Sequence, residues 1–444
     1  MDERAPTRRR FYYSINEVQL LMRCAAQLQR NATASILGVL GLLSSAPELW
    51  RFSFFVICFA LGQLRLCYTA VAMTLRRSTQ RDHGYCFRTW RDFAHQTDFR
   101  KAYFRFAPEH IPRLIAALRL PATMHANRYS FTADEAITVL LYMLSQNASL
   151  LDVNERFGIK RARASAIFRF TIAWLHDRWY KPLFVTDFKR WLPDFPAWAA
   201  AVLLKQGGAG IGCAYTGIIA FIDGTLNPTC RPKKWLQQQF YSGYKKKHGV
   251  HWQACLAPMG LIIDLAGPFE GRHTDKWMLR VSELCERLQA ALQWAVEVCG
   301  KPVNWLCGIW YFFSDAGYNR RLQLAVMFAK PPGGELTAQQ TAVNHTLSKT
   351  RIANEWIFGT IGNTFPYVTD KSNLLVGRGT PGSIFVVAAL LTNALTCLEG
   401  NGTSKYFDLT PPTLEAYFEG APAAQACPSA WYENLDKYDD VADA

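Results

Sequence analysis

Two stretches with the same pattern decide the fold: Gly217-Ile-Ile-Ala-Phe-Ile-Asp223 and Gly308-Ile-Trp-Tyr-Phe-Phe-Ser-Asp315. Each is a short apolar run that ends in a carboxylate, and such a run predicts a buried β-strand. Because an unpaired buried carboxylate is costly, an acid at this place indicates a cation or another polar partner. If the two strands are neighbours, Asp223 and Asp315 lie at one edge of the sheet, where α/β proteins usually place ligand sites.

The segments around these strands predict the order β-β-β-α-β-α. Residues 249–256 and 260–265 predict two further strands joined by the turn Pro258-Met-Gly260. Residues 277–298, 341–361 and 385–398 have the spacing or apolar character of helices. This order matches a ribonuclease H-like domain, an α/β fold in which helices flank a mixed sheet. We expect this domain over residues 210–400.

A third acid, Glu355, lies in Arg351-Ile-Ala-Asn-Glu355, where the Arg and the Glu share one helix face. An ordinary surface ion pair is the alternative explanation of that spacing. Three hard oxygen ligands suit Mg²⁺, and two such ions about 4 Å apart activate a water or a 3′-hydroxyl and stabilise the leaving oxygen. In this hypothesis Asp223 bridges two ions, while Asp315 and Glu355 each hold one.

Asp275 competes for a place in this site. It precedes Asp315 by the same number of residues as Glu355 follows it, so spacing cannot exclude it. We expect Asp275 beside the site rather than in it, because an Asp that opens a helix is also a routine cap. His273 is a candidate to orient a phosphate or a water, and a structural role is the favoured alternative.

Residues 101–205 predict an all-helical region that resembles a helix-turn-helix. Thr132-Ala-Asp-Glu135 has the form of a capping box, residues 150–157 predict a short helix stopped by Gly158, and residues 161–174 predict another. Arg161 and Arg163 open that last helix, where a recognition helix contacts DNA. An ordinary helical hairpin with a solvated basic face explains the pattern equally well.

The distribution of charge favours a polyanionic partner. The formal net charge is +14, and residues 401–444 hold eight acidic against two basic residues, so this tail carries −6 and the first 400 residues carry +20. When basic side chains contact DNA phosphates, the counterions condensed on the DNA are released, which favours binding. The strongly basic first 400 residues therefore suit DNA as a partner. The alternative is a basic protein that binds no polyanion. Lys245, Lys246 and Lys247 are candidate phosphate contacts, with Tyr241 and Tyr244 beside them for packing on sugar or base. A solvated basic turn is the alternative there.

The remaining sequence patterns concern the cellular compartment, a membrane span and the two ends of the chain. The twelve cysteines form no C-x-x-C pair, which favours reduced core residues of an intracellular protein over disulfides or structural zinc. The apolar run from Phe52 to Leu64 is 13 residues long, whereas a membrane span needs about 20, so a buried helix is expected and no membrane partner. Residues 1–100 predict a helical region of unknown role, and residues 401–444 an acidic, loose tail.

Several short motifs occur in a fixed order between residues 105 and 400. They are Asp223-Gly-Thr225, Tyr241-Ser-Gly-Tyr-Lys-Lys-Lys-His-Gly249, Gly267-Pro-Phe-Glu-Gly-Arg-His-Thr-Asp275, Ser314-Asp-Ala-Gly-Tyr318, Asn344-His-Thr-Leu-Ser-Lys-Thr-Arg351, Glu355, Phe358-Gly359 and Asn393. Together they resemble the PIF/Harbinger group of DDE transposases and its Harbinger-derived nuclease relatives. The first 100 residues depart from the resemblance.

The resemblance implies both an activity and its setting. The activity is metal-dependent cleavage and transfer of DNA strands at transposon ends, with two Mg²⁺ ions for which Mn²⁺ can substitute. The motif match implies that Asp223, Asp315 and Glu355 are the catalytic acids. The setting is the nucleus, with double-stranded DNA and a Myb/SANT-type accessory protein as partners and a homodimer or larger assembly. The alternative is a domesticated, non-catalytic DNA- or chromatin-binding protein that keeps the fold.

Overall fold

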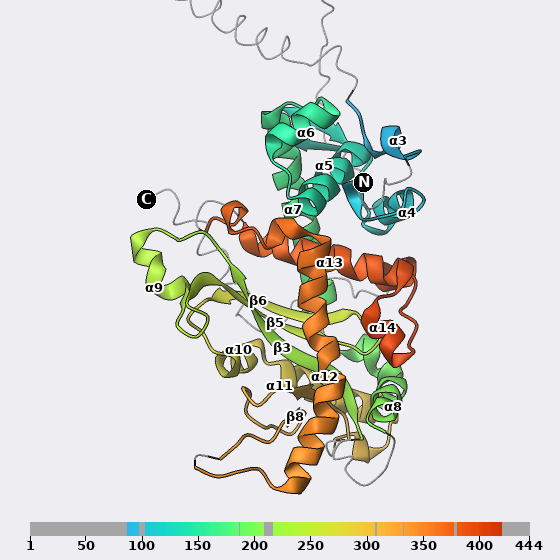
Figure 1. Ribbon diagram of the computed structural model, residues 1–444. Helices are drawn as coiled ribbons and strands as arrows, with labels where there is room; N and C mark the ends of the chain where they lie inside the picture. The colour runs from blue at the N-terminus through green and yellow to red at the C-terminus, as the bar shows by residue number, and fades with distance from the viewer. Residues whose placement is uncertain are drawn as a thin grey trace, which may run out of the picture. The chain divides into compact units, whose positions relative to one another are not determined.

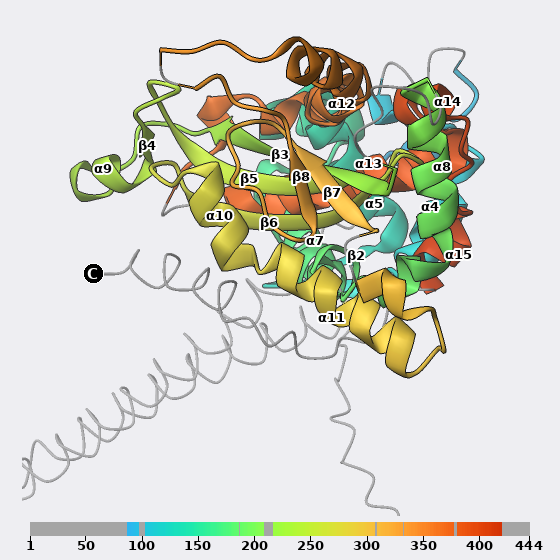
Figure 2. The same cartoon turned by 90° about the horizontal axis from the view of Figure 1, so that it is seen from below.

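A mixed sheet of six strands forms the centre of the computed structural model (Figures 1 and 2). Its strands are β3 (Ile218–Pro228), β4 (Tyr241–Ser242), β5 (Lys247–Leu256), β6 (Ile262–Glu270), β7 (Tyr311–Ser314) and β8 (Leu324–Val326). The order across the sheet is β6–β5–β3–β7–β8, and β4 pairs with the start of β5. Strand β5 is antiparallel to both β3 and β6, whereas β7 and β8 run parallel to β3. A mixed sheet with helices around it is compatible with a ribonuclease H-like fold.

The structure describes most of the chain after residue 86. The described ranges are 87–96, 103–185, 187–207, 216–306, 309–331, 333–376 and 380–419, without the side chains of residues 306, 349 and 351–357. All of them belong to one unit that begins at Phe87. The predictions made for the apolar run from residue 52 to residue 64, and for nearly all of residues 1–100, lie outside the described residues.

Strand β3 differs from its prediction in a way that matters for the site. The apolar run was expected to end at Asp223, followed by a tight turn. Instead β3 continues to Pro228, because Gly224 and the residues after it keep pairing with β5 as far as Gly249. Asp223 therefore lies in the middle of a strand, opposite Ala254. The second run behaves as predicted, since β7 ends at Ser314, immediately before Asp315.

The long helix expected over residues 277–298 is two helices. These are α10 (Asp275–Ser282) and α11 (Leu284–Glu297), and the break falls at Glu283, whose φ of 51° is left-handed and cannot continue an α-helix. Arg287 on α11 forms an ion pair of 2.6 Å with Asp264 on β6, and Asp264 is only 1% exposed. This pair fastens α11 to the sheet.

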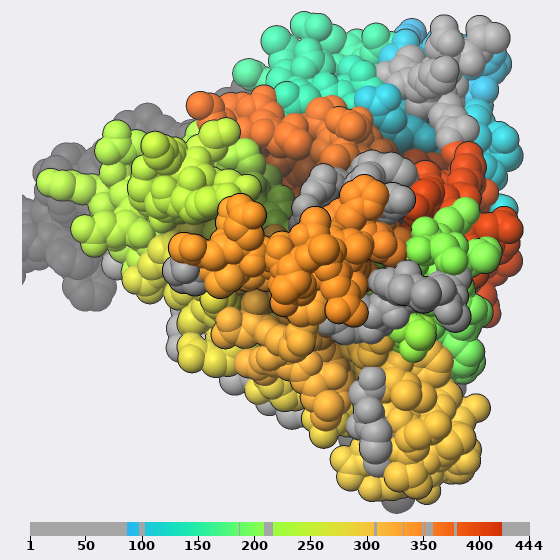
Figure 3. All heavy atoms as spheres, turned by 60° about the horizontal axis from the view of Figure 1, so that its bottom comes forward, coloured from blue at the N-terminus to red at the C-terminus, as the bar shows by residue number. Residues whose placement is uncertain are grey.

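Helix α12 (Ala338–Thr364) covers the opposite side of the sheet from α11 (Figure 2). Its residues Val343 and Leu347 are buried against Phe221 of β3 and Phe313 of β7. Figure 3 looks onto this side of the molecule, with α12 in orange near the centre. The predicted helix over residues 341–361 is thus confirmed, and it begins three residues earlier, where the side chain of Thr337 caps it.

The region before the sheet is not all-helical as expected. Its helices are α3 (Trp90–Phe93), α4 (His110–Ala117), α5 (Ala133–Gln146), α6 (Leu150–Phe157), α7 (Arg161–Phe184) and α8 (Phe195–Lys205), and a β-hairpin of β1 (Thr123–Ala126) and β2 (Tyr129–Thr132) interrupts them. The predicted capping box and the stop at Gly158 are confirmed. Helix α7 runs ten residues beyond its predicted end. Its Tyr180 donates a hydrogen bond of 2.7 Å to the carbonyl of Gly267 in β6, which ties the helical region to the sheet.

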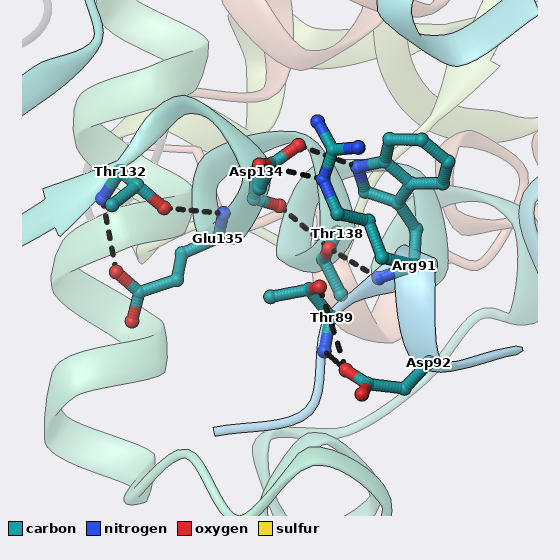
Figure 4. A network of polar contacts seen from close by, with 8 residues as sticks. Thr89, Arg91, Asp92, Thr132, Asp134, Glu135 and Thr138 are labelled. Carbon is teal, nitrogen blue, oxygen red and sulfur yellow. Dashed lines mark hydrogen bonds and ion pairs between the residues drawn. The ribbon is translucent and has the colours of Figure 1, made fainter. Parts of the chain in front are cut away.

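The N-terminus of α5 is the centre of a polar network (Figure 4). Thr132 and Glu135 exchange the two hydrogen bonds of the capping box, at 3.2 and 2.9 Å. Asp134 accepts hydrogen bonds from the indole of Trp90 and the guanidinium of Arg91, at 2.8 and 3.0 Å. These contacts dock α3 onto α5. Whether α5–α7 bind DNA as a helix-turn-helix stays a prediction.

Helix α13 (Pro381–Glu399) is the one described helix that is long and apolar enough to cross a membrane, and two thirds of it is buried in the fold. Its Asn393 binds both backbone groups of Ile262 on β6, at 2.8 and 3.0 Å, so α13 also serves as a core helix of the sheet.

The chain after Gly400 departs from the predicted loose tail. Residues 402–419 form α14 (Gly402–Phe407) and α15 (Leu414–Glu419), which bury Phe407, Leu414, Tyr417 and Phe418. Apolar residues at helical spacing form these two helices, although Pro and Gly residues lie close to them in the sequence. Residues 420–444, which hold most of the acids, lie outside the described residues.

Candidate active site

Strand pairing brings Asp223 and Asp315 together. Strands β3 and β7 are neighbours and parallel, and Phe221 is the register partner of Phe313. Asp223 and Asp315 each follow that pair by two residues, so they lie at the same level of the sheet, where β7 ends and β3 runs on. Asp223 Oδ1 accepts a hydrogen bond of 2.9 Å from the amide of Gly224, and Asp315 Oδ1 accepts one of 2.9 Å from the amide of Gly317. The sequence prediction that the two acids share one edge is therefore supported by the register.

Asp275 joins these two acids. It is the first residue of α10, and its Oδ1 lies against the backbone of Gly224, so close that a Cβ added there would clash with it. Burial raises the pKa of Asp275, and the negative charge of Asp315 raises it further, while the positive charge of Lys245 acts in the opposite direction. Asp275 therefore shares the electrostatic environment of Asp315. Its helix is capped by the preceding residue, Thr274, and whether Asp275 is a ligand or stands beside the site stays a prediction.

Tyr318 is a buried tyrosine to which the sequence interpretation assigned no role. It is 4% exposed, and among the described residues its hydroxyl has no hydrogen-bond partner. Burial raises its pKa well above the ordinary value, and the charges of Asp275, Asp223 and Asp315 raise it further. The hydroxyl therefore lies in the electrostatic field of the three carboxylates. Its position three residues after Asp315, in a turn that follows a strand, was the signal that could have identified it.

Glu355, the third acid of the sequence hypothesis, lies on α12. That helix contacts β3, the strand of Asp223. The side chains of Glu355 and Arg351 are not among those described, so their predicted roles stay predictions. Among the described residues, no three His, Cys, Asp or Glu side chains lie close enough together to hold one metal ion. Asp223, Asp275 and Asp315 nonetheless offer carboxylate oxygens, the kind of ligand that a hard divalent cation with bound water prefers.

Residues 222–393 match the family model of the DDE superfamily endonucleases. The match begins one residue before Asp223 and ends at Asn393, so it contains the sheet from β3 onward, the acidic cluster and helices α10–α12. It confirms the expected resemblance at the level of a DDE transposase family. DDE superfamily endonucleases generally use divalent metals. A comparison with curated proteins and one with solved structures gave no match.

His273 contacts three other residues of the matched range 222–393. Its ring stacks on that of Trp277, with centroids 3.5 Å apart, and its Nε2 lies 3.5 Å from Glu270 Oε2. Its carbonyl is 2.8 Å from Nδ1 of His251. Burial lowers its pKa, which favours the neutral ring. These contacts support the structural role that the sequence interpretation favoured.

Three lysines within the matched residues 222–393 are exposed at the turn between β4 and β5. They are Lys245, Lys246 and Lys247. Lys246 has a positive φ of 53°, which turns the chain back, and the amide of Lys245 donates to Ser242 Oγ at 3.3 Å. The positive charge of Lys245 acts to lower the pKa of Asp275, so the turn contributes to the electrostatic environment of that acid.

Arg161 and Arg163 occupy different environments. Both precede the matched residues 222–393. Arg161 is exposed at the start of α7. The side chain of Arg163 is only 12% exposed, forms an ion pair of 2.7 Å with Glu135 and lies over the ring of Phe87. It also donates to the carbonyl of Ser130 at 2.9 Å. The prediction that Arg163 contacts DNA is corrected, because its guanidinium joins α7 to α5 and β2.

Proposed function

We propose that this chain is a metal-dependent DNA endonuclease of the transposase type, which cuts and transfers DNA strands at transposon ends. The observation that carries the proposal is the register of β3 and β7, which brings Asp223 and Asp315 side by side, with Asp275 against Gly224, inside the segment that matches the DDE superfamily endonucleases. The order of the strands supports a ribonuclease H-like fold for this segment. Carboxylates side by side on two neighbouring parallel strands provide the ligands that such chemistry uses.

In this proposal Asp223, Asp315 and Glu355 hold two Mg²⁺ ions, with Mn²⁺ as a substitute. When bound, the ions supply a deprotonated water or 3′-hydroxyl and a positive field for the leaving oxygen. Asp223 would help to hold both ions, while Asp315 and Glu355 would each hold one. Asp275 and Tyr318 orient water around the acids, and Lys245, Lys246 and Lys247 hold the phosphate backbone. Arg351, which shares a helix face with Glu355, keeps that carboxylate in place.

A cleavage assay tests this assignment. The substrate is a plasmid carrying the element's own ends, and the readout is nicking in Mg²⁺ by the full chain. Asp223→Asn, Asp315→Asn and Glu355→Gln are each expected to lower the rate by about 1,000-fold, because each removes a charge worth roughly 4 kcal/mol in the transition state. Matched controls are Asp177→Asn and Glu335→Gln, whose side chains are 81% and 88% exposed. Equal cleavage by wild type and Asp223→Asn would show that the site lies elsewhere.

A non-catalytic DNA- or chromatin-binding protein is the second candidate, favoured by the fact that no three metal-binding side chains among those described meet around one point. Titration with Mn²⁺, followed by electron paramagnetic resonance, separates the two functions. An endonuclease is expected to bind two ions, and Asp223→Asn to weaken both. If wild type binds no divalent ion, the nuclease assignment fails and the binding protein is favoured.

The setting of the activity is also a proposal, supported by the motif resemblance and the basic body. We place the chain in the nucleus, on double-stranded DNA, as a homodimer or larger assembly with a Myb/SANT-type accessory protein and without a membrane partner. Light scattering of the purified chain, alone and with transposon-end DNA, measures the assembly. A monomer in both conditions would contradict the homodimer.

A further inference from the structure

A long stretch around the active site contains no acidic residue. Between Asp223 and Asp264 the chain has neither Asp nor Glu. Over the same stretch it carries a set of basic residues: Arg231, Lys233, Lys234, Lys245, Lys246 and Lys247. A solvated surface normally carries both positive and negative side chains. A stretch of this length whose charged side chains are all positive therefore indicates a polyanion as its partner.

The same stretch holds the exposed aromatic side chains of the described structure. Within the described ranges, the aromatic residues that are exposed are Trp235 at 55%, Tyr241 at 41% and Tyr244 at 89%. Trp235 lies on the short 3-10 helix η4 (Lys234–Leu236), Tyr241 starts β4, and Tyr244 is in the turn before β5. Aromatic rings are usually the best-buried parts of a protein, so their gathering on one segment points to a ligand with flat apolar faces.

The segment is built to present these rings. Leu236 and Phe240 are buried beneath it, at 3% and 4% exposure. Helix α9 (Gln237–Phe240) is held at its end by the amide of Arg272, which donates to the carbonyl of Gln239 at 3.1 Å. The absence of a side chain at Gly271 lets the backbone of Phe240 approach it closely. The apolar side of the segment is thus packed, while its three exposed rings face outward.

The position of this segment connects it to the acidic cluster. Pro228, the last residue of β3, pairs with Gly249 of β5 just beyond the lysines, and Lys245 acts electrostatically on Asp275. From Asp223 to Pro228 the strand spans about 17 Å, or roughly five nucleotides of a DNA strand. Figure 3 shows the segment in yellow-green, standing out at the left of the view.

We propose that Trp235, Tyr241 and Tyr244, with the lysines Lys245–Lys247, form a stacking surface for unpaired DNA bases within a few nucleotides of the cleaved phosphate. The inference rests on the proposed function, since the acidic cluster defines which phosphate is meant. In a duplex the base faces are covered by their neighbours and only edges and phosphates are accessible, so exposed ring faces select bases that have left the stack. The lysines hold the backbone of the same strand.

Binding of two DNA probes to the full chain tests the stacking surface. The probes are a single-stranded oligothymidine of about 16 nucleotides and a blunt random-sequence duplex of the same length. Trp235→Ala and Tyr244→Ala are each expected to weaken binding of the single strand by about 5- to 150-fold, the range measured for one stacked base, and to leave the duplex unchanged. Tyr244→Phe keeps the ring and is expected to bind as wild type does. The matched control is Leu204→Ala, an exposed apolar side chain (71%) on α8.

A second readout locates the unpaired bases. With 2-aminopurine placed at successive positions of a transposon-end duplex, wild type is expected to change its fluorescence at positions close to the cleavage site, because the base exchanges its neighbours in the duplex for a protein ring. Tyr244→Ala is expected to reduce that change. Equal losses on the single strand and the duplex, or no loss on either probe, would overturn the stacking surface.

These outcomes separate from those of the proposed function. Asp223→Asn is expected to abolish cleavage while it leaves oligothymidine binding intact. If wild type binds the single strand through Tyr244 but never cleaves, the endonuclease assignment fails and the stacking surface stands. If wild type cleaves but Tyr244→Ala and Trp235→Ala bind both probes as wild type does, the stacking surface fails alone.

Discussion

The carboxylate of Asp275 lies directly against the backbone of Gly224, the residue that follows Asp223 in β3. A Cβ built on Gly224 would clash with Oδ1 of Asp275 and come within 3.2 Å of its Cγ. This contact joins two elements that are distant in sequence, strand β3 and helix α10. It also explains why the strand carries a glycine immediately after its acid.

Gly224→Ala is therefore expected to displace Asp275 and to lower the cleavage rate by about 100-fold, the typical effect of a shift of about 1 Å in a catalytic group. Gly224 does not have a positive φ, so the alanine adds no backbone strain and the effect comes from the contact alone. Plasmid nicking and Mn²⁺ affinity are the measurements. The control is Gly243→Ala, whose added methyl group meets no atom within 4 Å. Full activity in Gly224→Ala would mean that the position of Asp275 is unimportant.

The buried hydroxyl of Tyr318 leads to a prediction with two opposite effects. Since this hydroxyl has no hydrogen-bond partner among the described residues, Tyr318→Phe removes a desolvated polar group at almost no cost in volume. The free energy of unfolding of the metal-free protein is expected to rise by about 1 kcal/mol. Affinity for Mn²⁺ is expected to fall by about 10- to 100-fold, as for other groups that orient metal ligands. Urea unfolding and metal titration measure the two effects, and a loss of stability with unchanged Mn²⁺ affinity would assign Tyr318 to packing alone.

Much of this sheet could be predicted from the sequence, because its strands are strongly apolar runs with turn residues between them. Strand β8 could not, since Leu324–Val326 is only three residues long and has too few residues for a period. The continuation of β3 past Asp223 was missed for another reason. Gly224 and Pro228 are poor strand residues on their own, and it is pairing with β5 that keeps them extended.

The membership of the acidic cluster depended on tertiary contacts. Spacing along the chain treats Asp275 and Glu355 alike, and only the folded chain shows that α10 brings Asp275 against Gly224, the residue after Asp223. Tyr318 was hidden because a tyrosine after a strand is usually an ordinary core residue. Arg163 looked like a DNA contact because helix spacing alone cannot reveal that Glu135, 28 residues earlier, faces it.

The basic residues are expected to divide into those that bind DNA and those that stabilise the fold. Lys245→Ala, Lys246→Ala and Lys247→Ala should each lower the salt dependence of DNA affinity by about one unit of slope, because each removes one phosphate contact. Arg163→Met should leave that slope unchanged and lower the free energy of unfolding by about 3 kcal/mol, since it leaves Glu135 buried without its cation. Fluorescence anisotropy over a range of salt concentrations and urea unfolding measure the two quantities. An altered slope in Arg163→Met would restore the original DNA-binding assignment.

The buried ion pair between Arg287 and Asp264 predicts a stability that depends on pH. Burial raises the pKa of Asp264, and Arg287 holds it down in part. Arg287→Met removes that opposing charge, so the pKa of Asp264 in the folded protein rises further. A carboxyl whose folded pKa lies above its unfolded value contributes stability at low pH and loses it as pH rises through the folded pKa. The variant is thus expected to be about 3–5 kcal/mol less stable than wild type at neutral pH, and to recover as the pH falls toward about 4.

Urea unfolding between about pH 4 and pH 8 measures this recovery, with Asp264→Asn/Arg287→Met as the matched control. The double variant has no carboxyl at position 264, so its deficit relative to wild type is expected to follow only the pH dependence of wild type itself. Because Asp264 is on β6 and Arg287 on α11, the pair reports on the face of the sheet opposite α12. A deficit in Arg287→Met that is equal at every pH would mean that the loss comes from packing of the arginine side chain and its hydrogen bond of 3.2 Å to the carbonyl of Ser282, rather than from an uncompensated charge.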